Sequence, residues 1–163
     1  MIAFIRFVHS LSKLCGIIST ALITSAVLVT TQMVVVRYAL KMSTVWQTEY
    51  VIFSLAAATF IGAPYVLMKK GHVNVDLIPY YLNQKGKNIL AIVAAVLALS
   101  FLGILFYSSV ELTNHAWVKN LKTPTIWSFP LWKVYIFLPI GMGIMILQYL
   151  AEILSIIYNV KEN

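Results

Sequence analysis

The sequence has little charge, few acidic residues and a single cysteine. Charged residues make up 10% of its 163 residues, and only 5 of them are Asp or Glu. So little charge excludes an ordinary soluble domain, in which about a quarter of the residues are charged. The lone Cys15 excludes an intramolecular disulfide and paired-thiol chemistry, and we interpret it as a small buried apolar residue. What is present, 61% hydrophobic residues and a mean hydropathy of +0.88, indicates a membrane protein.

Four apolar runs are long enough to cross a bilayer. They cover residues 14–36, 50–68, 89–110 and 134–157. As a helix the first run reaches roughly 34 Å at about 1.5 Å per residue, which crosses a hydrocarbon core of about 30 Å. We therefore predict an all-α integral membrane protein with a single domain, residues 1–163. Its four transmembrane helices are joined by connections with short interfacial segments.

The positive charges predict an orientation. The formal net charge of +7 comes from short clusters of Lys and Arg between the apolar runs, so we expect it to serve topology and anionic lipid rather than nucleic acid. An even number of spans puts both termini on one side, and that side carries seven Lys and Arg residues against five on the other. This favours cytoplasmic termini. The candidate interfacial anchors are Trp117, Trp127 and Trp132 on the second side and Lys69 and Lys70 on the first.

Small residues in the first two runs predict close helix contacts. The two stripes are Gly16, Thr20, Thr24 and Thr31 in the first run and Ser54, Ala58 and Gly62 in the second. Such spacing lets helix backbones approach closely within lipid, either inside this chain or against another protein, and the sequence leaves both open. Pro64 and Pro139 should kink their helices or mark a shift in their paths.

Polar residues mark the ends of the runs. Glu49 opens the second helix and could pair with Arg37 across the first connection. Glu111 is expected at the C-terminal end of the third helix, where the helix dipole disfavours a carboxylate, so it should face water or a nearby lysine. We expect residues 73–82 to lie in the membrane surface and residues 111–133 to form an ordered interfacial loop.

The span interiors, taken as residues 14–36, 50–68, 89–110 and 134–151, carry no charged residue, and Glu152 follows the last of them. The three histidines lie in connections at unrelated positions. Ion-binding transporters usually expose ionisable groups at mid-depth, and metal sites need ligands at related spacings. No nucleotide-binding loop is present either. We therefore predict neither a self-sufficient pump nor an enzyme, and no cofactor or metal in this chain.

Several short motifs resemble one family. They are Arg37-Tyr38, Trp46-Gln47-Thr48-Glu49, an apolar helix reaching Gly62, Lys69-Lys70-Gly71-His72 followed by Asp76, Phe129-Pro130-Leu131-Trp132 and Leu138-Pro139-Ile140-Gly141. In this order they resemble the small membrane subunit, DctQ-like, of tripartite ATP-independent periplasmic (TRAP) transporters. The similarity covers nearly the whole chain, with matching length and span count.

The resemblance implies a noncatalytic permease subunit in the bacterial inner membrane. It would bind and scaffold a large multispan membrane subunit of the elevator type, which would hold sodium and take up an organic acid such as sialic acid or a C4-dicarboxylate. A periplasmic substrate-binding protein would deliver that acid. The implied assembly or scaffold positions are Arg37, Trp46, Glu49, Gly62, Gly71, His72, Asp76, Pro130 and Pro139. The alternative is an independent, homo-oligomeric four-helix exporter or channel.

Overall fold

The computed structural model describes residues 2–69 and 84–157, and within these ranges the regular structure is helical. The long helices are α1 (Ile2–Tyr38), α2 (Val45–Met68), α4 (Gln84–Val118) and α6 (Phe137–Ile157), and the short helix α5 (Trp132–Tyr135) precedes α6. All four long helices contain a stretch long and apolar enough to cross a membrane. The prediction of an all-α chain with four candidate spans is therefore confirmed.

Two helices extend well beyond their apolar runs. α1 has 37 residues and begins at Ile2, and α4 has 35 residues and ends at Val118. The apolar runs mark only the part that hydrocarbon would cover, whereas the polar residues beyond them are compatible with a helix and no proline interrupts them. Glu111 consequently lies inside α4, about two turns before its end, and is exposed. Its predicted place at the helix C-terminus was wrong.

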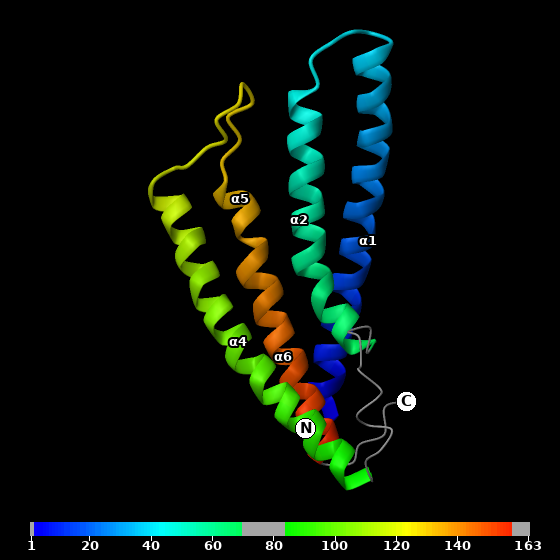
Figure 1. Cartoon of the computed structure of the whole chain (residues 1–163), viewed down its shortest axis with the longest axis vertical. Coiled ribbons are helices and arrows are strands. Elements are labelled where there is room, and N and C mark those ends of the chain that lie inside the picture. The colour runs from blue at the N-terminus through cyan, green and yellow to red at the C-terminus, as the bar shows by residue number, and fades with distance from the viewer. Residues whose placement is uncertain (1, 70–83, 158–163) are drawn as a thin grey trace.

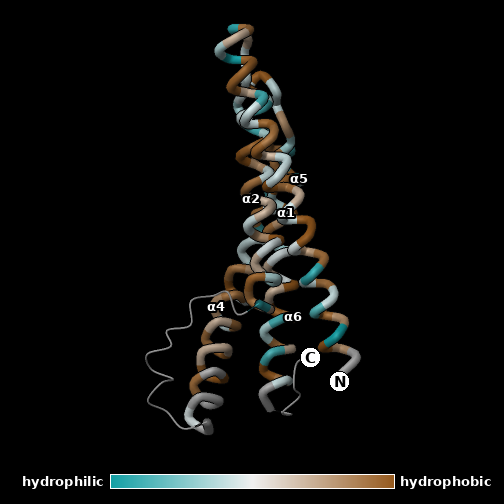
Figure 2. Tube along the Cα trace, turned by 90° about the vertical axis from the view of Figure 1, so that its right-hand side faces the viewer, coloured by the Kyte–Doolittle hydropathy of each residue, from teal (hydrophilic) through white to brown (hydrophobic). Residues whose placement is uncertain are grey.

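The helices form two antiparallel pairs (Figure 1). α1 packs along α2, α4 packs along α6, and α6 also contacts α2 and α1. The pairs come together at the end where α1 begins and α6 ends, here called the terminal end, and they separate toward the end that carries residues 39–44 and 119–131, here called the loop end. Hydrophilic residues gather toward both ends of the molecule (Figure 2).

One face of α1 is buried along most of its length. Its buried positions recur three or four residues apart from Ile5 to Ser19, with one more a further two turns on, and include Ile5, Val8, Ser12, Cys15, Ser19 and Ala26. This spacing is that of a helix packing against neighbours at a small crossing angle. Val8 and Ile5 pack with Ala151 of α6, and the Ser12 hydroxyl donates a hydrogen bond of 2.8 Å to Oε1 of Gln148. This face ties α1 to α6 at the terminal end.

Of the two predicted stripes of small residues, the one on α2 is buried and the one on α1 is mostly exposed. Ser54, Ala58 and Gly62 are buried, so the stripe of α2 is confirmed as a contact face within this chain. Thr20, Thr24 and Thr31 are exposed, and each hydroxyl donates to the carbonyl four residues before it in α1. Beyond Gly16 the stripe of α1 is therefore not a contact face within this chain, and the other alternative, a face for another protein, stays a prediction.

Candidate scaffold site at the loop end

Glu49 is the centre of a polar cluster at the loop end. Its carboxylate, on a side chain only 8% exposed, accepts hydrogen bonds from the hydroxyls of Thr123, at 3.1 Å, and Thr125. Oγ1 of Thr123 also accepts the Phe129 N–H at 3.0 Å. Glu49 lies in the second turn of α2, whereas both threonines belong to the connection between α4 and α5. The cluster thus joins one helix pair to the loop of the other.

The connection that Glu49 holds is itself ordered. Its two arms pair at Lys122 and Pro130, with the N–H of Thr123 donating to the Phe129 carbonyl at 2.9 Å. The ring of Phe129 lies 5.6 Å from that of Phe53 on α2 and 4.9 Å from that of Trp127. Aromatic pairs at these separations contribute stabilisation in addition to that from the apolar area that they bury. The predicted ordered loop is confirmed, but it covers residues 119–131 because α4 continues to Val118.

Arg37 forms a hydrogen bond across the first connection, residues 39–44, and this bond does not involve Glu49. Its guanidinium donates to Oγ1 of Thr44 at 2.8 Å, across the turn in which Lys41 adopts a φ of 54°. Glu49 takes its hydrogen bonds from the connection between α4 and α5 instead. Arg37 and Glu49, which could pair according to the sequence, therefore have separate partners in the structure.

The remaining predicted site residues fall into four groups: those at the loop end, those in contacts between helices, Lys69 at the end of α2, and those outside the described residues. Trp46 lies in the first turn of α2, and its side chain is 44% exposed. The loop end also holds Pro130, Trp117, Trp127 and Trp132, with the rings of Trp117 and Trp132 4.3 Å apart edge to face. Gly62 and Pro139 lie on helices in contacts described below, and Lys69 caps the C-terminus of α2. Lys70, Gly71, His72 and Asp76, with the segment 73–82, lie outside the described residues.

A second close contact joins the pairs between α2 and α6. A Cβ atom added to Gly141 of α6 would lie 2.2 Å from the Phe60 carbonyl oxygen of α2, so only glycine fits there. Pro64 explains why that carbonyl is available. Proline has no N–H to donate to the carbonyl four residues earlier, which is that of Phe60. The freed oxygen faces the backbone of Gly141, and a weak Cα–H···O contact suits this arrangement.

Pro139 acts in a similar way at the start of α6. It lies three residues after Ile136, which separates α5 from α6 but keeps helical φ and ψ of −61° and −24°. The predicted kink or shift in path at Pro139 stays a prediction. Without the N–H of residue 139, the Tyr135 carbonyl is left free by its own helix. The Thr113 hydroxyl of α4 lies 3.1 Å from it and shares its one proton between this carbonyl and the Ser109 carbonyl, which is at 2.7 Å. Each proline thus frees a carbonyl that meets a neighbouring helix.

Gly62 lets α1 and α2 approach closely. A Cβ atom there would lie 2.6 Å from Oγ of Ser19, whose hydroxyl donates to the Ala58 carbonyl at 2.8 Å. Farther toward the loop end, the Ser25 hydroxyl and the Tyr50 hydroxyl lie 3.0 Å apart. Hydrogen bonds between helices in lipid contribute about 0.6 kcal/mol on average. Small residues and a few hydroxyls therefore build this seam.

Sequence reasoning missed Thr123, Thr125 and Gly141 as contact residues. The Thr-Pro-Thr sequence at 123–125 sits in a tryptophan-rich connection on the same side as Glu49, and this was the available signal. For Gly141 the signal was Pro64, since its missing N–H identifies the carbonyl that a glycine could approach. In the ranges that the structure describes, no three His, Cys, Asp or Glu side chains gather into a metal-binding group.

The four long apolar helices and their two polar connections define a small multi-pass membrane protein. A family model, the DctQ component of tripartite ATP-independent periplasmic transporters, matches residues 26–158. The chain belongs to this family, so it is the small membrane subunit of a TRAP transporter and a transporter component rather than a member of a known enzyme family. Neither a curated protein nor a solved structure matches the chain.

Proposed function

We propose that this chain is a noncatalytic permease subunit that binds the large membrane subunit of its transporter and holds it in place. The observation that carries the proposal is the Glu49 cluster, which fastens α2 to the connection between α4 and α5. Hydrogen bonds to a charged acceptor contribute about 1.5–3 kcal/mol each. They act where the two helix pairs would otherwise stand apart (Figure 1). A frame closed at both ends suits a subunit that stays fixed while its partner moves substrate.

The proposal extends to the complete system. The large subunit holds the sodium ions and the substrate, an organic acid such as sialic acid or a C4-dicarboxylate, and a periplasmic binding protein delivers that acid. The complex lies in the bacterial inner membrane with both termini of this chain in the cytoplasm. The charge distribution supports this orientation, because more Lys and Arg residues flank the terminal end. The uncharged span interiors fit a subunit whose partner carries the ion sites.

Replacing Glu49 tests the scaffold role. Glu49→Ala removes the acceptor of both threonine hydroxyls, so we expect less large subunit to copurify with this chain. Sodium-driven uptake by proteoliposomes should fall in its maximal rate, with the half-saturating substrate concentration unchanged. Glu49→Gln keeps the size and one acceptor oxygen, so its loss should be smaller. Glu111→Ala is the matched control, since Glu111 is an exposed carboxylate on α4 and should leave assembly intact.

Two results would count against the scaffold role. One is a Glu49→Ala complex that assembles fully but binds substrate more weakly, because Glu49 would then belong to the substrate path. The other is robust sodium-dependent uptake by proteoliposomes that contain this chain alone. That second result would instead support the independent homo-oligomeric exporter or channel.

A further inference from the structure

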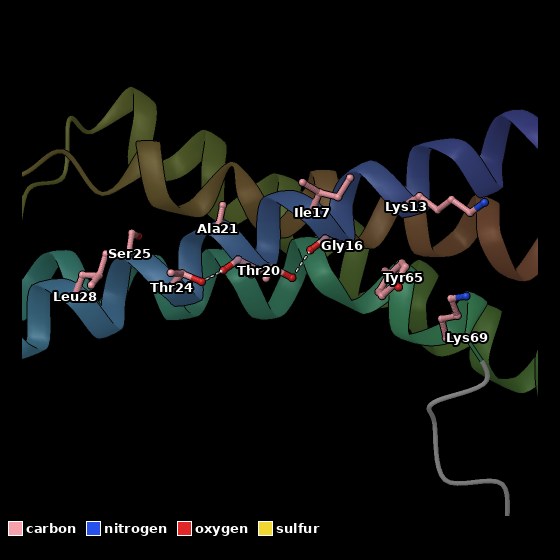
Figure 3. Close-up of a pocket in the computed structure, with 10 residues that line it drawn as sticks. All are labelled: Lys13, Gly16, Ile17, Thr20, Ala21, Thr24, Ser25, Leu28, Tyr65 and Lys69. Carbon is pink, nitrogen blue, oxygen red and sulfur yellow. Dashed lines mark hydrogen bonds between the residues drawn. The ribbon is translucent and has the colours of Figure 1, made fainter.

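The geometry of α1 and α2 points to a binding site for one anionic phospholipid, a site distinct from the Glu49 cluster. A groove of about 760 Å³ opens between the two helices, along the middle part of α1 from Lys13 to Leu28 and beside Tyr65 and Lys69 at the end of α2. Figure 3 shows the residues that line it, with Lys13 and Lys69 together at one end and Leu28 at the other. We propose that the lipid headgroup binds at the lysines and that an acyl chain lies along the groove.

The groove exists because large side chains are missing from its floor. Gly16 is so close to α2 that an added Cβ atom would lie 2.6 Å from Cγ of Tyr65, so the tyrosine ring lies against the backbone of α1. The next positions along this side of α1 are the small residues Thr20, Ala21 and Thr24. Ile17 and Leu28 also border the space. The result is a shallow channel rather than a filled seam.

The floor is apolar in spite of its threonines. The Thr20 hydroxyl donates to the Gly16 carbonyl at 2.9 Å, and the Thr24 hydroxyl donates to the Thr20 carbonyl at 2.8 Å. Figure 3 draws both bonds within the one helix. A threonine whose hydroxyl is bonded to its own helix has no donor left for a ligand. The groove is therefore suited to hydrocarbon and not to a polar solute.

The apolar part of the groove is about as long as one leaflet of a bilayer is thick. The whole groove runs from Lys13 to Leu28, which are fifteen residues apart on α1, a rise of about 22 Å. Its apolar part, from Gly16 to Leu28, rises about 18 Å. One leaflet contributes about 15 Å of hydrocarbon, half of the core thickness. An acyl chain that begins beside Lys13 and Lys69 would therefore end near the middle of the membrane.

Charge identifies the headgroup. Lys13 and Lys69 are both exposed residues, one on each helix, and their ammonium groups border the same end of the groove. Lysines at a membrane surface attract anionic headgroups. A single apolar channel that ends between two cations from different helices fits the two parts of an anionic phospholipid, the chain and the phosphate.

Lipid competition tests the proposal on the full chain. The purified protein in a neutral detergent is offered equal amounts of phosphatidylglycerol and phosphatidylcholine with the same acyl chains, and native mass spectrometry counts the bound lipids. We expect one phosphatidylglycerol to be retained in preference. Lys13→Gln and Lys69→Gln should each weaken its binding by about fivefold, and together by roughly 25-fold, without affecting phosphatidylcholine. Ala21→Trp, which fills the groove from an exposed position, should remove the bound lipid whatever its headgroup.

Matched variants control for nonspecific effects. Lys119→Gln with Lys122→Gln removes two exposed lysines at the loop end, and Ala94→Trp adds the same bulk to an exposed position of α4. Both should keep the phosphatidylglycerol, and all variants are first compared in helical content and elution volume. Equal retention of the two lipids by the unsubstituted chain would overturn the proposal, even if a variant failed to fold. So would unchanged lipid binding in Ala21→Trp accompanied by loss of the large subunit, which would assign the groove to a partner helix.

Discussion

The two ends of the molecule are held together by different chemistry. At the terminal end α1 and α6 meet through an apolar cluster and the hydrogen bond from Ser12 to Gln148. At mid-height the helices meet through small residues and backbone, as at Gly62 with Ser19 and at Gly141 with the Phe60 carbonyl. At the loop end the pairs separate, and a carboxylate with two hydroxyls and a group of aromatic rings bridges the space. Close packing in lipid gains van der Waals contact, whereas a polar bridge can span helices that do not touch. Although the helix pairs separate toward the loop end, the Glu49 cluster and the aromatic rings still join them there.

The largest effect is expected at the backbone contact. Gly141→Ala places a methyl group against the Phe60 carbonyl, which cannot rotate away, so α6 must move from α2. We expect the free energy of unfolding to fall by about 1–3 kcal/mol, the usual range for overpacking. Denaturant titration in micelles, followed by far-ultraviolet circular dichroism, measures the change.

Gly103→Ala is the control for this prediction. Gly103 lies on α4, and an added Cβ atom there would meet nothing within 4 Å. Its free energy of unfolding should change by no more than about 0.5 kcal/mol. If the two alanine variants proved equally stable, the close approach of α6 to α2 would be contradicted.

The next effect is expected at the polar bridge. Thr123→Val with Thr125→Val keeps the side-chain shapes but leaves the Glu49 carboxylate without its two hydroxyl donors. An unsatisfied buried group costs about 1–3 kcal/mol, and here the cost should appear as local loosening of residues 119–131. Trypsin should then cleave after the exposed Lys119 and Lys122 several times faster.

Thr31→Val provides the comparison for the polar bridge. Its hydroxyl is exposed and bonds only to the Val27 carbonyl in its own helix, so trypsin should cleave this variant at the parental rate. Cleavage of the double valine variant at that same rate would show that the threonine hydroxyls do not hold the connection.

The smallest effect is expected at Thr113 and Pro139, where a side-chain hydroxyl meets a backbone carbonyl. Thr113→Val removes a hydroxyl that is shared between the Ser109 carbonyl of its own helix and the Tyr135 carbonyl, which Pro139 leaves free. The free energy of unfolding should fall by about 0.6 kcal/mol. Pro139→Ala restores an N–H that can satisfy the same carbonyl. A double-mutant cycle on these two positions should therefore show a smaller effect of Thr113→Val in the alanine background. Strict additivity would refute the link between the proline and the hydroxyl.

The apolar runs predicted the four helices because burial in lipid demands about 20 apolar residues whatever the neighbours are. The stripe of Ser54, Ala58 and Gly62 was also readable, since α2 is enclosed by α1 and α6. The contact face of α1 was not. Small residues occupy several faces of that helix, and only the positions of α2 and α6 decide that Ser12 and Ser19 are buried while Thr20 and Thr24 are exposed.

The partner of Glu49 lay beyond local reasoning for a related reason. Arg37 is near in sequence and opposite in charge, whereas Thr123 is 74 residues away and neutral. Distance along the chain favoured the first, but the helix arrangement brings the second into contact. A buried carboxylate satisfied by hydroxyls needs no ion pair, because hydrogen bonds to the charged form also stabilise it.

All four tryptophans lie at the loop end: Trp46 in the first turn of α2, and Trp117, Trp127 and Trp132 in or beside the connection between α4 and α5. The protein therefore carries its own optical reporter of one end. Its intrinsic tryptophan fluorescence will respond when a partner or a substitution disturbs residues 119–131, and it will be nearly silent to events around Lys13 and Lys69. A change in this fluorescence would therefore distinguish a disturbance at the loop end from one around Lys13 and Lys69.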